Sequence, residues 1–73
     1  MTIEEITAQI DCIKDNIYDD ELCHINEDDL REEFLNYLSN LTGDELRLEL
    51  MDIPQKAKLV LSTGDLNFCR WCA

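Results

Sequence analysis

The residues best suited to metal chemistry in this 73-residue chain are four cysteines and one histidine. Cys69 and Cys72 are separated by two residues, a spacing at which two thiolates can chelate one metal ion or form a redox couple. Together with Cys23 and His24 they supply the four ligands of a structural zinc site. Such a site would tie the last residues to the loop between the first two expected helices and stabilise a small core.

The spacing of these residues makes zinc the less favoured interpretation. Cys23 and His24 are adjacent in the sequence, and adjacent side chains do not chelate easily in tetrahedral geometry. A redox role for Cys69 and Cys72 would need a βαβ scaffold, which the sequence pattern does not predict. We therefore expect no cofactor, with zinc as an alternative, and expect Cys23 and Cys69 to be small core residues.

No set of residues in the sequence predicts catalysis. His24 has no recognisable nucleophile and orienting partner, and Gly43 and Gly64 are the only glycines, so a glycine-rich phosphate loop is excluded. In size and acidity the chain is similar to acyl carrier proteins. Ser39 and Ser62, however, stand in Leu-Ser-Asn and Leu-Ser-Thr rather than in the Asp-Ser-Leu motif that carries their prosthetic group. We reject that function and expect a protein that is not an enzyme.

Acidic residues are the main chemical feature of the chain. Seventeen Asp and Glu residues against six Lys and Arg residues give a net charge of −11. Residues 1–33 hold twelve acids and two bases, a net charge of −10, whereas residues 34–73 hold five acids and four bases, a net charge of −1. This charge argues against direct nucleic-acid binding, because it repels phosphate. Hydrophobic residues form 45% of the chain, which favours a folded domain over a disordered acidic tail.

The apolar residues predict the helices that must position these acids. Thr2 and Glu5 have the form of a capping box, which predicts that a first helix begins there and ends within residues 18–22. Its apolar face is a row of isoleucines at alternating spacings of three and four residues, Ile3, Ile6, Ile10, Ile13 and Ile17. This face can pack within the chain or against a second copy, which would form a homodimer.

The rest of the chain predicts three or four further short helices. Asn26, followed by three acidic residues, indicates a second helix start, Thr42 a third, and Pro54 a fourth, with a last turn over residues 65–69. The residues expected to face inward from the third helix are Leu46, Leu50 and Met51. We therefore predict an all-α fold, a small bundle of four to five short helices forming a single domain over residues 1–73.

These elements predict one acidic surface on the first two helices. Asp11, Asp15 and Asp19 are four residues apart on the side of the first helix away from the isoleucines, roughly 6 Å per step along the axis. The acids near the second helix start extend this surface. The residues expected to bind a partner are Asp11, Asp15, Asp19, Asp20, Glu27, Asp28 and Asp29.

The acidic surface favours a non-enzymatic interaction or regulatory protein that docks on a basic surface of a protein partner. Candidates for an additional apolar anchor are Met51, Phe68 and Trp71, of which Phe68 is expected in the core. The alternative is a nucleic-acid mimic, since a rigid row of carboxylates can occupy a basic groove built for DNA or RNA. Its acidic composition resembles that of small phage-encoded DNA mimics, and small acidic proteins without motifs are typical of accessory genes of phages and mobile elements.

The sequence also predicts where the protein resides. Residues 1–5 have no basic region of the kind that begins an export signal, and no apolar run approaches the roughly 18 residues of a membrane helix. We expect a cytoplasmic protein that does not bind membranes, with its cysteines in a reducing compartment.

Overall fold

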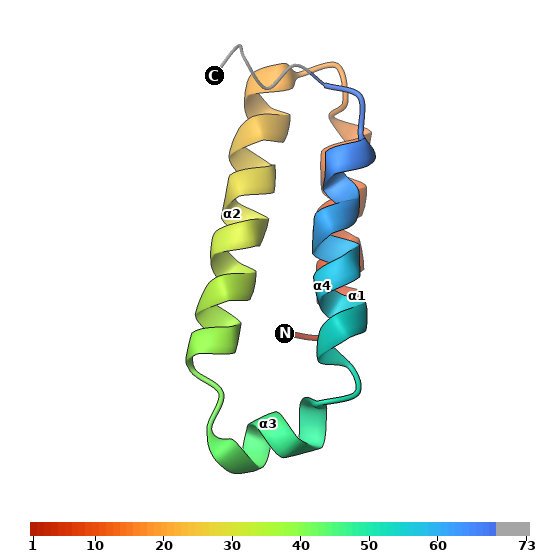
Figure 1. Ribbon diagram of the computed structural model, residues 1–73. Coiled ribbons are helices and arrows are strands. Elements are labelled where there is room, and N and C mark those ends of the chain that lie inside the picture. Colours follow the sequence, from red (N-terminus) through yellow and green to blue (C-terminus); the bar gives the residue numbers. More distant parts are fainter. Residues whose placement is uncertain (69–73) are drawn as a thin grey trace.

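The computed structural model describes residues 1–68 and confirms an all-α fold, with no strand in this part of the chain. Its elements are α1 (Ile3–Asp15), α2 (Asp20–Ser39), α3 (Gly43–Glu49), α4 (Ile53–Leu61) and a 3₁₀ turn, η1 (Ser62–Asp65). The described part is elongated, with principal extents of 41 × 17 × 15 Å. Helices α1, α2 and α4 run along its length, and α3 crosses one end, where it joins α2 to α4 (Figure 1).

Helix α1 begins where the capping box predicts it. The Thr2 hydroxyl accepts a hydrogen bond from the Glu5 backbone N–H at 3.1 Å. The helix ends at Asp15, because Asn16 caps it and its side-chain amide donates to the Cys12 carbonyl at 2.8 Å. The prediction that this helix reaches residues 18–22 was wrong, since Asn16 satisfies carbonyl groups that a further helical turn would have used.

Helix α2 begins six residues earlier than Asn26, the predicted start. The Asp19 carboxylate accepts a hydrogen bond from the Leu22 backbone N–H at 3.0 Å and thereby caps the helix. Cys23, in the first turn, is fully buried against the end of α1, so burial of this side chain also favours the earlier start. Asn26 and the acids after it therefore lie inside a 20-residue helix.

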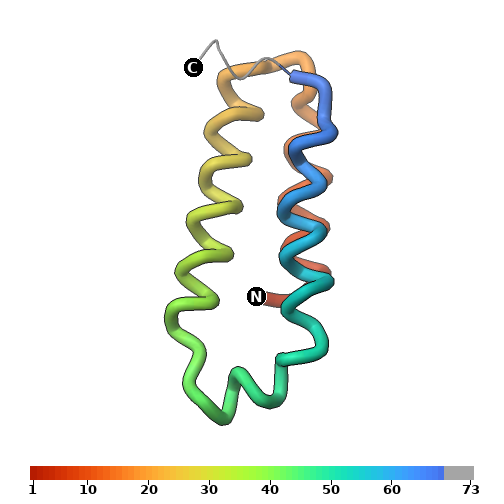
Figure 2. The backbone as a smooth tube through the Cα atoms, viewed as in Figure 1, coloured from red at the N-terminus to blue at the C-terminus, as the bar shows by residue number. Residues whose placement is uncertain are grey.

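The core lies between α1, α2 and α4. Helix α1 packs against both other helices, whereas α2 and α4 contact each other at fewer positions. Figure 2 traces the same path, in which α2 and α4 run side by side along the length of the molecule and are joined at one end by α3. The buried hydrophobic residues are Ile6, Ile10, Ile13, Cys23, Leu30, Phe34, Val60 and Phe68. The predictions that Cys23 and Phe68 are core residues are confirmed, and Ile6, Ile10 and Ile13 of the isoleucine face pack within the chain.

Helix α3 contributes no buried side chain. Thr42 caps it as predicted, but the expectation that its apolar residues face inward was wrong, and Leu46, Leu50 and Met51 are exposed. The physical reason is that this seven-residue helix crosses the end of the molecule, beyond the reach of the core. Pro54 lies in the first turn of α4 as predicted, and Asp65 ends η1 instead of starting a further helix.

Candidate partner-binding surface

A polar groove with acidic residues in its lining lies between α1 and α2. It has a volume of about 480 Å³, and its lining residues are Gln9, Cys12, Asn26, Asp29, Glu32, Glu33 and Asn36. Three of these are carboxylates, and none of them is cationic. Because like charges line a concave surface, the negative potential is focused there, and the groove favours cationic groups.

Two of the predicted partner-binding residues extend this groove on α1. Asp11 and Asp15 are exposed, and no ion pair is found for either within residues 1–68. Asp15 follows Cys12 by three residues, so it lies on the neighbouring part of the helix surface. Asp11 and Asp15 therefore stand beside the groove on α1.

The structure shortens the predicted row of three carboxylates. Because α1 ends at Asp15, Asp19 is not part of this helix but caps α2, although its side chain remains exposed. Asp20, the first residue of α2, is half-buried. Only Asp11 and Asp15 keep the four-residue spacing on one helix.

Glu27 does not belong to the exposed acidic surface, and its prediction as a partner-binding residue is corrected. It is only 2% exposed, and its carboxylate lies 3.6 Å from the Arg31 guanidinium one turn later in α2. The error follows from the displaced helix start. Placing Asn26 at a cap made Glu27 an exposed first-turn residue, whereas in the 20-residue helix it shares the core-facing side with Leu30 and Phe34.

The two remaining predicted acids, Asp28 and Asp29, lie on the surface of α2. The Asp28 carboxylate lies 3.4 Å from the imidazole Nδ1 of His24, one turn earlier. Asp29 lines the polar groove. The adjacent positions thus differ in surroundings, because successive residues of a helix point about 100° apart.

Of the groove residues, only Asp29 was among the predicted partner-binding residues; Glu32 and Glu33 were predicted only to extend the acidic surface, and the neutral polar residues were not predicted to take part. The Gln9 amide on α1 donates a hydrogen bond to the Glu33 carboxylate on α2, and Glu32, Asn26 and Asn36 also line the groove. The spacing of the α2 residues could have identified this side of the helix, since these positions recur at intervals of three and four residues. Their pairing with Gln9 depends on how α1 and α2 pack.

A second concavity lies between α2 and α4 and is apolar. Its volume is about 290 Å³, and its lining residues are Arg31, Phe34, Leu35, Ala57, Val60 and Leu61. Phe34 and Val60 are core residues that form part of its wall, whereas Leu35 and Leu61 are exposed. Helix α2 is therefore flanked by a polar, acidic groove on one side and an apolar groove on the other.

The metal hypothesis receives no support from the described residues. No group of three or more His, Cys, Asp or Glu side chains that could hold a metal ion occurs within residues 1–68. The Cys23 thiol is buried and donates to the carbonyl oxygens of Ile13 and Asn16, at 3.3 and 2.9 Å. The predicted ligands Cys69 and Cys72, and the candidate anchor Trp71, lie outside the described residues.

The described part of the chain holds no helix of the length and apolar character that would span a bilayer. Comparison with protein-family models, with curated proteins and with solved structures finds no match for this chain. The class of protein that the fold defines is a small all-α helical bundle.

Proposed function

We propose that this protein is a non-enzymatic interaction protein that docks its acidic surface on a basic surface of a protein partner. The observation that carries the proposal is the polar groove between α1 and α2, in which Asp29, Glu32 and Glu33 face the same space without a cationic neighbour in the lining. Lysine and arginine side chains of a partner would supply the missing positive charge, and arginine can bind a carboxylate through two parallel hydrogen bonds.

The distribution of charge supports the same proposal. Ten of the eleven net negative charges belong to residues 1–33, which form α1 and most of α2. A field concentrated on two helices of a small protein accelerates and orients encounters with an oppositely charged surface. The apolar groove beside α2 can receive an apolar side chain of the partner, and this contact would add to the electrostatic attraction.

The proposal is tested by reversing charge in the groove and comparing the result with a control variant of the same net charge. In the variant Asp29→Lys, Glu32→Lys the groove loses two carboxylates, and the control variant Asp52→Lys, Asp65→Lys changes the net charge equally at exposed positions outside the groove. Each protein is immobilised and exposed to extract of its source cell, and captured proteins are quantified by mass spectrometry at low and high salt. Circular dichroism of both variants controls for loss of helix.

We expect capture of one protein with a basic surface, weakened by salt and reduced about tenfold by the groove variant but not by the control. Equal loss in both variants would mean that only net charge matters, and unchanged capture in the groove variant would refute the proposed surface. If DNA or RNA competes for the captured protein, the partner surface is a nucleic-acid groove and the protein acts as a mimic.

A further inference from the structure

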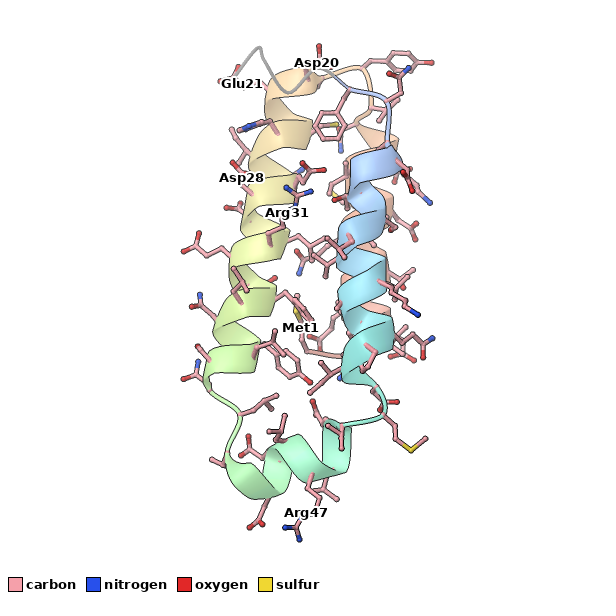
Figure 3. The ribbon with its side chains drawn as sticks, viewed as in Figure 1. Met1, Asp20, Glu21, Asp28, Arg31 and Arg47 are labelled. Atoms are coloured by element: carbon pink, nitrogen blue, oxygen red, sulfur yellow. The ribbon has the colours of Figure 1, made fainter. Side chains whose placement is uncertain are left out.

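The apolar groove between α2 and α4 lies where a four-helix bundle would have its fourth helix. Helix α1 packs on one side of α2 and α4, which contact each other at fewer positions and leave their other side open. Figure 3 shows Arg31 on the side of α2 that faces α4. In a four-helix bundle, this open position beside two neighbouring helices is filled by a fourth helix. Helix α3 does not fill it, because it crosses the end of the molecule.

The walls of the groove are suited to apolar side chains. Phe34 and Val60 are almost fully buried and form its inner wall, whereas Leu35 is 65% exposed and Leu61 is 69% exposed. These two leucines come from different helices, so a ligand lying between them would contact both. A groove of about 290 Å³ holds a few large apolar side chains, which is the number that one face of a short amphipathic helix presents.

The charges beside the groove decide which helix fits. On α2 the exposed Asp28 and Glu32 precede Leu35 by seven and three residues, so they lie on the same strip of helix surface as this groove leucine. Arg31, the one charged residue of the groove lining, is paired with the buried Glu27. On α4 the exposed Lys58 lies one residue from Ala57 in the groove wall. The α2 edge therefore attracts cations. A second copy of this chain would bring another net charge of −11 to the same surface, and the mutual repulsion disfavours it as the occupant.

We propose that the α2–α4 groove binds one amphipathic helix of the partner protein. Its apolar residues, three and four positions apart, contact Leu35, Ala57 and Leu61, and its lysines or arginines lie along the edge that faces α2. The positive charge of the bound helix is taken from the proposed function, and the inference rests on that proposal in this respect. It adds the secondary structure of the bound segment and the apolar site that receives it.

The experiment uses synthetic peptides as probes of the full-length protein. The first is an 18-residue amphipathic Leu/Lys helix labelled with fluorescein, the second has the same composition in scrambled order, and the third replaces every lysine by glutamine. Binding is measured by fluorescence anisotropy, and the contacted residues are located by NMR chemical-shift changes. The variant Leu35→Gln, Leu61→Gln alters the groove, and Leu48→Gln, an exposed leucine on α3, is the matched control.

We expect the Leu/Lys helix to bind at least tenfold more tightly than the scrambled peptide, with shift changes at Leu35, Ala57 and Leu61. The double groove variant should lose roughly tenfold in affinity, and Leu48→Gln should lose none. Because the two groove leucines are exposed, their replacement leaves the core intact.

Three results would overturn the inference. The first is equal binding of the scrambled peptide, and the second is chemical-shift changes confined to α3. The third is a dimer of this protein in sedimentation experiments that the Leu61→Gln substitution dissociates, because a second copy would then occupy the groove. Equal affinity for the Leu/Gln peptide has a different meaning. It would refute the basic partner of the proposed function and this part of the inference, while the groove variant would still show whether the groove binds helices.

Discussion

Replacement of Lys56 by methionine tests how α3 is held to the rest of the protein. Lys56 on α4 is only 5% exposed, and its ammonium group donates to the Tyr37 hydroxyl at 3.0 Å and to the Glu49 carboxylate at 3.4 Å. It also lies 5.0 Å from the centre of the Tyr37 ring. Lys56 thus links α2, the last residue of α3 and α4, whereas α3 itself buries no side chain.

The expected loss follows from these three interactions. A hydrogen bond that involves a charged group contributes about 1.5–3 kcal/mol, and a cation above an aromatic ring adds about 0.5–1 kcal/mol. The ion pair with Glu49 adds little, because that carboxylate is about one-third exposed and water screens it. Methionine keeps most of the buried aliphatic chain and avoids burying an ammonium group, which offsets part of the loss. We expect the free energy of unfolding to fall by about 1–2 kcal/mol.

The assay is thermal and urea unfolding followed by circular dichroism. A loss of 1 kcal/mol lowers the melting temperature by about 4–8 °C in a domain of this size. Lys58→Met removes an exposed cation from the same helix and serves as the control. Amide hydrogen exchange should also accelerate in α3 more than in α2. Equal melting temperatures for the two variants, or unchanged exchange in α3, would refute the role of Lys56.

Two further predictions concern the core and the thiols. Leu30→Ala, at a fully buried position, should lower the free energy of unfolding by about 2–5 kcal/mol, as measured by urea unfolding. Leu48→Ala, at an exposed position, should change it by less than about 0.5 kcal/mol. Similar losses in the two variants would contradict the assigned core. In native protein, iodoacetamide should alkylate the exposed Cys12 and leave the buried Cys23 unmodified until urea is added, as peptide mass mapping can measure. Alkylation of both at the same rate would contradict the burial of Cys23.

Local signals predicted the starts of three helices. Thr2 and Thr42 cap the first turns of α1 and α3, and Pro54 lies in the first turn of α4, because each acts through contacts within one helical turn. The isoleucine spacing likewise predicted the buried face of α1. The start of α2 was misassigned, since Asp19 and Asn26 are both good cap residues and the sequence alone does not rank them.

Two helix boundaries changed the candidate site. The earlier start of α2 places Glu27 inside the helix, on the side that it shares with the buried Leu30 and Phe34, and the end of α1 at Asp15 separates Asp19 from the acids of α1. The side of α2 that carries Asp29 faces the groove next to α1. A rotation of the helix about its axis is enough to decide which acids reach water, and helix packing sets that rotation.

The sequence by itself determined the all-α class, the apolar face of α1 and the concentration of charge in residues 1–33, because these follow from composition and from spacing along one chain segment. Only the tertiary structure decided that α3 lies outside the core, that Lys56 and Glu27 are buried, and that α2 is flanked by one acidic and one apolar groove. These features depend on contacts between residues distant in sequence. Their positions follow from which helix faces pack together, and no local pattern encodes that choice.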